Sequence, residues 1–179
     1  ITYTGGEAKR GIDFTGKTTL IIKAGKTSTS WTIIGKANAG ENVVSELLRN
    51  SSAFYEWDHY PQGDVFDPIH HSQYYYHAHP QEERPDEHGH FHLFQRPGGM
   101  PAGVLPAPVP DYAPSPVPED ALSHLIAIAM SRAGEPVKLF TTNRWVTAET
   151  WYRAADVIAM LDRFRIDHAR PSWPVNMWV

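Results

Sequence analysis

The histidines of this chain are concentrated in one region, where they alternate with other residues. Eight of the ten lie between His59 and His92, and five of these form the runs His77-Ala-His79 and His88-Gly-His90-Phe-His92. Because side chains two apart on a strand share a face, each run places its imidazoles on one side of an extended segment. Imidazole is the commonest metal ligand in proteins, so we expect the chemistry of the chain here.

The two histidine runs lie in segments that predict a β-hairpin. Gln73–His79 and His88–Gln95 both alternate in character, and the loop 80–87 joins them. Opposed residues of an antiparallel pair point to the same face, so one register brings all five imidazoles together. Burial of the apolar opposite face fixes that register. The predicted pairs are His79 with His88, His77 with His90, and Tyr75 with His92, and the apolar face carries Tyr74, Tyr76, Ala78, Phe91 and Leu93.

The shared imidazole face predicts a mononuclear metal centre. Same-face neighbours lie about 5 Å apart across a strand pair and metal–imidazole bonds are about 2 Å long, so three rings can converge on one ion. Histidine and carboxylate ligands suit a divalent transition metal, namely Fe, Zn or Cu. If the centre is catalytic, the metal would activate water or dioxygen at an open coordination position, with Glu83 or Glu87 as proton carrier. The predicted ligands are His77, His79, His90, His92 and Glu83.

These motifs are also compatible with roles other than this metal centre. The imidazole face could be a solvated surface, or a layer hydrogen-bonded to tyrosine, aspartate and backbone. The spacing His77-x-His79-x-x-x-Glu83 resembles the first metal motif of the cupins, although His71 replaces its glycine and no second motif follows. Gly11–Thr18 matches the GxxxxGK[ST] phosphate-binding loop, but polar residues precede it and a strand-like segment follows, so we favour a turn.

Composition excludes several classes of function. The 179 residues include no cysteine, which excludes disulfides, thiolate metal sites and iron–sulfur clusters. A formal net charge of −4 with scattered basic residues argues against a nucleic-acid partner. No apolar stretch approaches the roughly 18 residues of a membrane span. We expect a soluble protein, with the cytoplasm favoured, although a removed leader before Ile1 stays compatible with the sequence.

The periodicity of the whole chain predicts an α+β fold. Its antiparallel sheet is built from two hairpins, about 72–95 and 122–142, and is backed by a C-terminal helix. Apolar residues at helical spacing predict helices over 41–49 and 154–164. The aromatic and acidic segment 54–68 predicts an ordered loop.

Two ends of the sequence differ from this central pattern. Residues 1–37 are rich in Gly, Thr and Lys and predict a β-like segment, separate from a histidine-rich domain over 38–179. In the C-terminal tail, Pro171 and Pro174 argue against a regular helix.

A second hypothesis makes the chain a non-catalytic accessory or structural subunit of a larger complex. Eight prolines and three glycines between Pro97 and Pro118 predict an extended arm without a helix or central strand. Such an arm gains little by folding on itself but can wrap around a partner. We therefore expect a protein partner or a second copy to bind residues 97–118 and the aromatic C-terminal tail.

Several uncommon strings in order give the chain a family resemblance. They are Phe54-Tyr-Glu-Trp-Asp-His-Tyr-Pro61, Gln73-Tyr-Tyr-Tyr-His-Ala-His-Pro80, Glu87-His-Gly-His-Phe-His92, Leu139-Phe-Thr-Thr-Asn-Arg-Trp-Val-Thr147 and Ala169-Arg-Pro-Ser-Trp-Pro-Val-Asn176. In these strings the chain resembles an uncharacterised bacterial family, largely proteobacterial, that is defined as a domain of unknown function. The resemblance runs from about residue 40 to the end of the chain. It implies the extent of a domain rather than a mechanism.

Overall fold

The chain forms two compact units, Ile1–Asn42 and Val43–Val179. The computed structural model describes residues 42–110, 117–170 and 172–179, without the side chain of Trp173, and the backbone of four N-terminal strands. In the first unit β1 (Tyr3–Thr4) pairs antiparallel with β2 (Glu7–Ala8), and β3 (Thr18–Ala24) pairs with β4 (Thr27–Ile33). The segment 11–18, which matches the GxxxxGK[ST] phosphate-binding loop, lies outside the described residues except for Thr18.

Five antiparallel strands form the sheet of the second unit, and they follow one another in sequence order. They are β5 (Tyr60–Phe66), β6 (Ser72–His77), β7 (Gly89–Gln95), β8 (Ser123–Met130) and β9 (Pro136–Phe140). This sheet and its helices confirm the predicted α+β class. The sequential order is a meander, whereas cupins are double-sheet jelly rolls, so the sheet does not support the cupin-like alternative.

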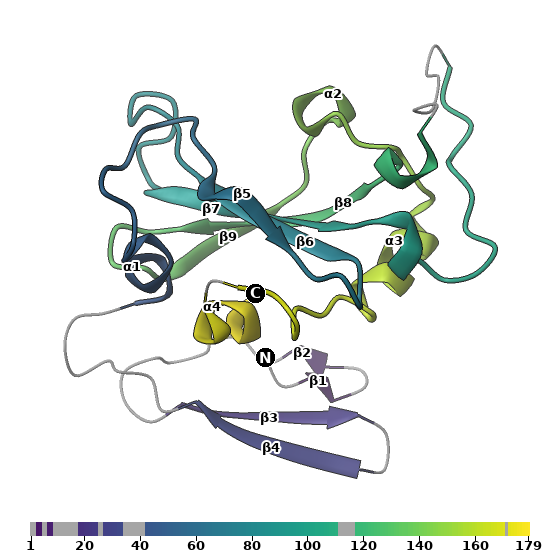
Figure 1. Cartoon of the computed structure of the whole chain (residues 1–179), viewed down its shortest axis with the longest axis horizontal. Coiled ribbons are helices and arrows are strands. Elements are labelled where there is room, and N and C mark those ends of the chain that lie inside the picture. Colours follow the sequence, from purple (N-terminus) through teal and green to yellow (C-terminus); the bar gives the residue numbers. More distant parts are fainter. Residues whose placement is uncertain are drawn as a thin grey trace. The chain divides into compact units, whose positions relative to one another are not determined.

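The two faces of the sheet have different partners. Tyr74, Tyr76 and Phe91 alternate onto one face and are fully buried. α1 (Val43–Leu48) and α4 (Trp173–Trp178) lie against this face in Figure 1, and α3 (Ala154–Leu161) adds Met160 to the same core. The histidines of β6 and β7 alternate onto the opposite face. That face is flanked by loops and lies on the side of α2 (Arg144–Thr147).

Two elements differ from the sequence expectation. Part of the predicted loop 54–68 is strand β5, whose pairing with β6 is irregular between Tyr60 and Val65 and therefore lacks a clean alternation. The tail forms α4, so the expectation that its prolines prevent a helix is wrong. Proline stands in the first turn of α4, where its missing N–H costs no hydrogen bond. Tyr74 Oη then donates to Asn176 Oδ1 at 2.7 Å and ties the tail to the sheet.

A buried carboxylate links the turn after β5 to a segment 100 residues away. The Asp67 side chain is fully buried. Its Oδ1 accepts from the backbone N–H groups of Ile69 and His70, and its Oδ2 accepts from those of Asp167 and His168, at 2.7–2.8 Å. Burial alone would raise the pKa of this carboxyl, but the four N–H donors outweigh it and lower the pKa to about 2.

The proline-rich arm is without long regular elements in its described part. Single 3₁₀ turns occur at Pro97–Gly99 and Pro118–Asp120, and Ala107 N donates to Trp151 O at 2.7 Å. Residues 111–116 lie outside the described part. Across the described chain, no helix combines the length and apolarity needed to cross a membrane.

Candidate metal centre

The register of the central hairpin brings histidines of two strands together. His77 pairs with His90 and Tyr75 with His92, as the alternation of the sequence predicts. The strand β6 ends at His77, so the predicted pair of His79 with His88 does not form. His88 lies instead beside the core face, where its Nδ1 is 2.7 Å from Tyr76 Oη. The placement of His88 among the five imidazoles was therefore wrong.

Three imidazoles form the tightest cluster. The Nε2 atoms of His77 and His90 are 2.8 Å apart, and the ring centroid of His79 lies 5.0 Å from that of His77 and 5.2 Å from that of His90. One ligand atom from each of the three lies within 4.8 Å of the other two. Three nitrogens at this spacing can hold a single metal ion.

Two carboxylates contact the outer nitrogens of this cluster. Glu83 Oε2 lies 3.2 Å from His79 Nδ1, and Glu87 Oε1 lies 2.9 Å from His90 Nδ1. A carboxylate on one ring nitrogen fixes the tautomer and the orientation of the ring, and leaves the other nitrogen available to a metal. Arg84 Nη1 in turn contacts Glu87 at 3.2 Å. The loop 80–87 thus orients the rings of both histidines.

A second imidazole pair lies deeper in the same face. His92 Nδ1 is 2.9 Å from His124 Nε2, and the two residues are 2% and 5% exposed. The His92 ring lies 4.7 Å from that of His90, but His92 is outside the set of three with mutually close ligand atoms. Sequence reasoning missed His124, which stands in the predicted hairpin 122–142 outside the two histidine runs.

Burial keeps the imidazoles of His77 and His90 neutral near pH 7. Burial, followed by the charges of His79, His59 and Arg84, lowers the pKa of His77 to about 4. The same cause, with His77 and Arg84 next, lowers the pKa of His90 to about 2. Neutral imidazoles keep a lone pair for a metal, and protons compete little for it at neutral pH.

Aromatic rings border the cluster on one side. The Trp57 ring lies edge-on to His79 with centroids 4.1 Å apart, and Trp57 N donates to Ala78 O at 2.9 Å. His59 stacks on Tyr75 at 3.6 Å. Trp57 is 53% exposed, so the cluster lies near the surface and an ion can reach it from solvent.

Other acidic and histidine residues of this region lie apart from the cluster or in exposed loops. Glu82 and Asp86 are exposed in the loop 80–87, and Glu56 and Asp58 are exposed in the segment before β5. His70 pairs with Asp167 at 3.3 Å. Sequence reasoning also missed Glu149, which accepts from His124 N at 2.8 Å. Burial raises the pKa of Glu149 to about 7 against the lowering effect of hydrogen bonds from His124 N and the Thr147 side chain.

A family model matches most of the chain. It is described as a domain of unknown function, and it covers residues 27–179. This match begins earlier than residue 40, where the resemblance was expected to start. No curated protein and no solved structure matches the chain.

Proposed function

The chain belongs to the DUF6969 family, a domain of unknown function, and we propose that it is a metal-binding protein with a mononuclear histidine centre. The ligands are His77, His79 and His90. The observation that carries the proposal is the approach of one ligand atom from each to within 4.8 Å of the other two. Support comes from the carboxylates on the outer nitrogens of His79 and His90, which is the usual environment of metal-bound imidazole.

The spacing of the nitrogens suits an ion after a small adjustment. Two nitrogens on a tetrahedral zinc lie about 3.3 Å apart, given bonds of about 2.0–2.1 Å. The Nε2 atoms of His77 and His90 are 2.8 Å apart in the hydrogen-bonded pair, so an ion requires them to separate by roughly 0.5 Å. Three histidines suit Zn, Fe or Cu and leave one position of a four-coordinate metal for water or a substrate.

Glu83 and His92 have different places in this proposal. Glu83 contacts His79 Nδ1, so it acts through His79 rather than as a direct ligand. The His92 ring centroid lies 4.7 Å from that of His90, and His92 is the candidate for a fourth ligand. Catalysis would use the open position on the metal, with Glu83 beside His79 or Glu87 beside His90 as the carboxylate that receives a proton.

Metal titration tests the centre. The metal-free protein is expected to bind one Zn²⁺ or Co²⁺ per chain, because three imidazole nitrogens are already gathered. His77→Ala or His90→Ala should lower the affinity by more than about 100-fold. Glu83→Gln and Glu87→Gln should lower it by about 10- to 100-fold, since they orient ligands without contacting the ion. Calorimetry gives the affinity, and the visible spectrum of bound Co²⁺ reports the number of ligands.

The control for this titration is His168→Ala, which removes an exposed histidine outside the cluster and should bind metal as the wild type does. Equal affinity of the wild type and His77→Ala would contradict the proposal. If His92→Gln leaves the Co²⁺ spectrum unchanged, the centre has three histidine ligands rather than four.

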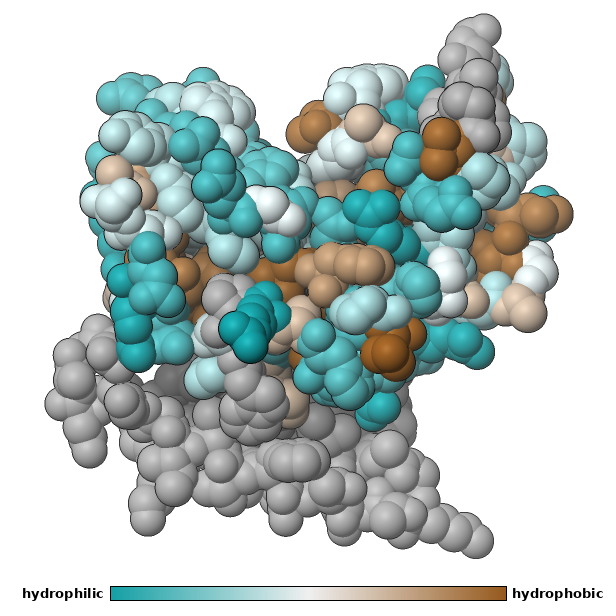
Figure 2. Space-filling model, viewed as in Figure 1, coloured by the Kyte–Doolittle hydropathy of each residue, from teal (hydrophilic) through white to brown (hydrophobic). Residues whose placement is uncertain are grey.

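The surface around β9 supports the subunit hypothesis as a second candidate. Leu139, Trp145 and Val146 are each at least 64% exposed, and Figure 2 shows hydrophobic side chains at the surface near α2 and along the arm. Exposed apolar groups of this kind mark protein interaction sites. The tail contributes less than expected, because Val175 and Asn176 are buried against the chain's own core. Light scattering of the purified protein should show an oligomer or a complex with a copurifying partner, and a monomer with no copurifying partner would oppose this candidate.

A further inference from the structure

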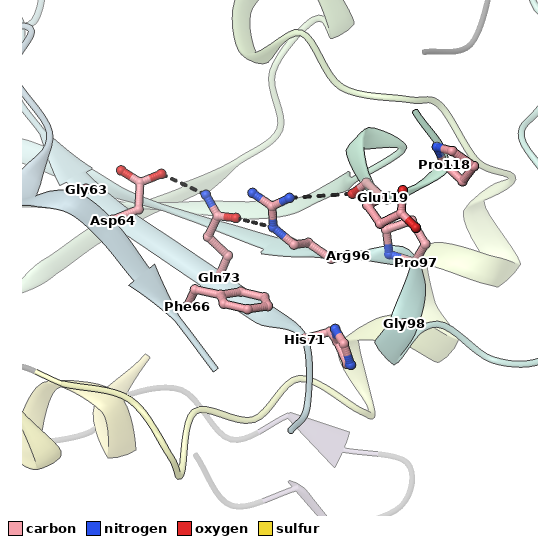
Figure 3. A pocket seen from close by; sticks show the side chains of 10 residues that line it. All are labelled: Gly63, Asp64, Phe66, His71, Gln73, Arg96, Pro97, Gly98, Pro118 and Glu119. Carbon is pink, nitrogen blue, oxygen red and sulfur yellow. Dashed lines mark hydrogen bonds between the residues drawn. The ribbon is translucent and has the colours of Figure 1, made fainter. Parts of the chain in front are cut away.

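A second pocket lies on the histidine face, at the other end of β6 and β7. Its volume is about 670 Å³, and Gln73 of β6, Arg96 after β7 and Phe66 of β5 line it (Figure 3). Gln73 is four residues from His77, which places it about 13 Å along the strand from the metal cluster. The pocket is therefore separate from the proposed metal centre.

Arg96 brings a positive charge into this pocket, and the two carboxylates that also line it, those of Asp64 and Glu119, form no direct ion pair with Arg96. Its Nε donates to Gln73 Oε1 at 2.7 Å, and its Nη1 reaches the backbone oxygen of Glu119 at 3.5 Å. Among the described residues, no carboxylate lies within 4.0 Å of the half-buried guanidinium, and no hydrogen bond from Nη2 is found. A guanidinium stays charged at all ordinary pH values, so these donors can serve an anion.

A chain of hydrogen bonds fixes the direction of this guanidinium. Gln73 Nε2 donates to Asp64 Oδ2 at 2.7 Å, which turns Gln73 Oε1 toward Arg96 (Figure 3). The other oxygen of Asp64 contacts His59 Nδ1 at 2.9 Å. The amide of Gln73 thus lies between Asp64 and Arg96. Because Gln73 is only 8% exposed, water competes little for these hydrogen bonds. Arg96 is thus anchored through Nε, and its terminal nitrogens stay available.

The walls around Arg96 are apolar and flat. The Phe66 ring lies 5.4 Å from the Arg96 guanidinium carbon and is 41% exposed. Pro97 and Pro118 line the pocket as well. The His71 ring lies flat against Gly98, where a Cβ atom would come within 2.7 Å of the imidazole. Only glycine at this position lets the ring pack so closely.

We propose that the Arg96 pocket binds a small carboxylate whose apolar body lies against Phe66 and Pro97. A guanidinium with free terminal donors matches the two oxygens of a carboxylate, and the neighbouring ring and prolines match an apolar body. Glu119 also lines the pocket, but its side chain is exposed, so water weakens its repulsion of a bound carboxylate without removing it. This proposal does not depend on the metal centre.

Benzoate and its neutral isostere benzamide test the pocket in the full-length protein. Calorimetry or NMR titration should show benzoate binding at least about tenfold more tightly than benzamide, because only benzoate pairs with a charged guanidinium. Arg96→Gln should remove this preference, and Arg96→Lys should keep part of it, since lysine retains the charge but not the paired donors. Glu119→Gln should tighten benzoate binding by removing a nearby negative charge.

Two comparisons keep the test decisive. The benzoate–benzamide pair and Glu119→Gln need no change to Arg96, so they apply even if Arg96→Gln does not fold. The metal-site variant His90→Ala should bind benzoate as the wild type does, which separates a failure of this pocket from a failure of the metal centre. Equal affinity for benzoate and benzamide, or unchanged benzoate affinity in folded Arg96→Gln, would overturn the proposal.

Discussion

Lowering the pH from 7 to 5 is expected to reduce the free energy of unfolding of the metal-free protein by about 4 kcal/mol. The effect arises from His92 and His124, which are 2% and 5% exposed and face each other at 2.9 Å. Burial lowers the pKa of His124 from 6.5 to about 4, and burial together with the neighbouring imidazoles lowers the pKa of His92 further. In the unfolded chain both groups return to the ordinary value.

The sign of this effect follows from proton uptake. Below pH 6.5 the unfolded chain binds protons that the folded protein does not, so stability is full above that pH and is lost as the pH falls toward 4. Each of the two histidines contributes about 2 kcal/mol by pH 5, and whole domains are stable by only about 5–15 kcal/mol. Burial of His77 acts in the same direction. Burial lowers the pKa of His90 as well, but the Glu87 carboxylate 2.9 Å from its ring opposes this effect, so His90 is left out of this sum.

Urea unfolding at pH 7, 6 and 5 in the presence of a chelator measures this loss. His124→Gln should reduce the pH dependence by about one proton, because one buried titrating group is gone. His168→Gln is the matched control, since it replaces a histidine whose side chain is exposed and lies outside the buried pair. A free energy of unfolding that stays constant from pH 7 to pH 5 would show that the rings are not held neutral by burial.

The register of the central hairpin was predictable because two independent patterns agree on it. Tyr74, Tyr76 and Phe91 must be buried together, and this requirement allows only registers that place His77 on the same face as His90, the pair that forms. A shift by one residue would expose these three aromatic rings to solvent and bury polar side chains in their place. The sequence therefore determines which imidazoles face each other wherever both strands continue.

The ends of the strands and the neighbours beyond them were not predictable in the same way. β6 stops at His77, and His88, one residue before β7, contacts Tyr76 where the pairing of the two strands ends and alternation no longer sets the direction of side chains. His124 joins the cluster through β8, whose pairing with β7 shifts register between Leu93 and Phe94. A register shift of this kind is not visible in the hydrophobic pattern of the sequence. The position of His124 on β8 beside His92 therefore became known only from the structure.

Replacing Asp67 with alanine is expected to lower the free energy of unfolding by about 4 kcal/mol. The carboxylate is fully buried and accepts four backbone N–H groups, two in the turn after β5 and two at Asp167 and His168. Alanine leaves these donors without an acceptor, and each unsatisfied buried donor costs about 1–3 kcal/mol before relaxation or water entry reduces the sum. Chemical denaturation at pH 7 measures the difference.

Two further substitutions identify the origin of this loss. Asp67→Asn keeps one acceptor oxygen but places an NH₂ group where the second pair of N–H groups needs an acceptor, so its effect should lie between those of aspartate and alanine. Asp162→Ala is the control, because Asp162 is exposed after α3 and should change stability by no more than about 0.5 kcal/mol. If Asp67→Ala and Asp162→Ala had equal effects, Asp67 would not be what joins the β5–β6 turn to the segment before α4. The helix α4 would then depend for its position on the apolar core and on the hydrogen bond from Tyr74 to Asn176.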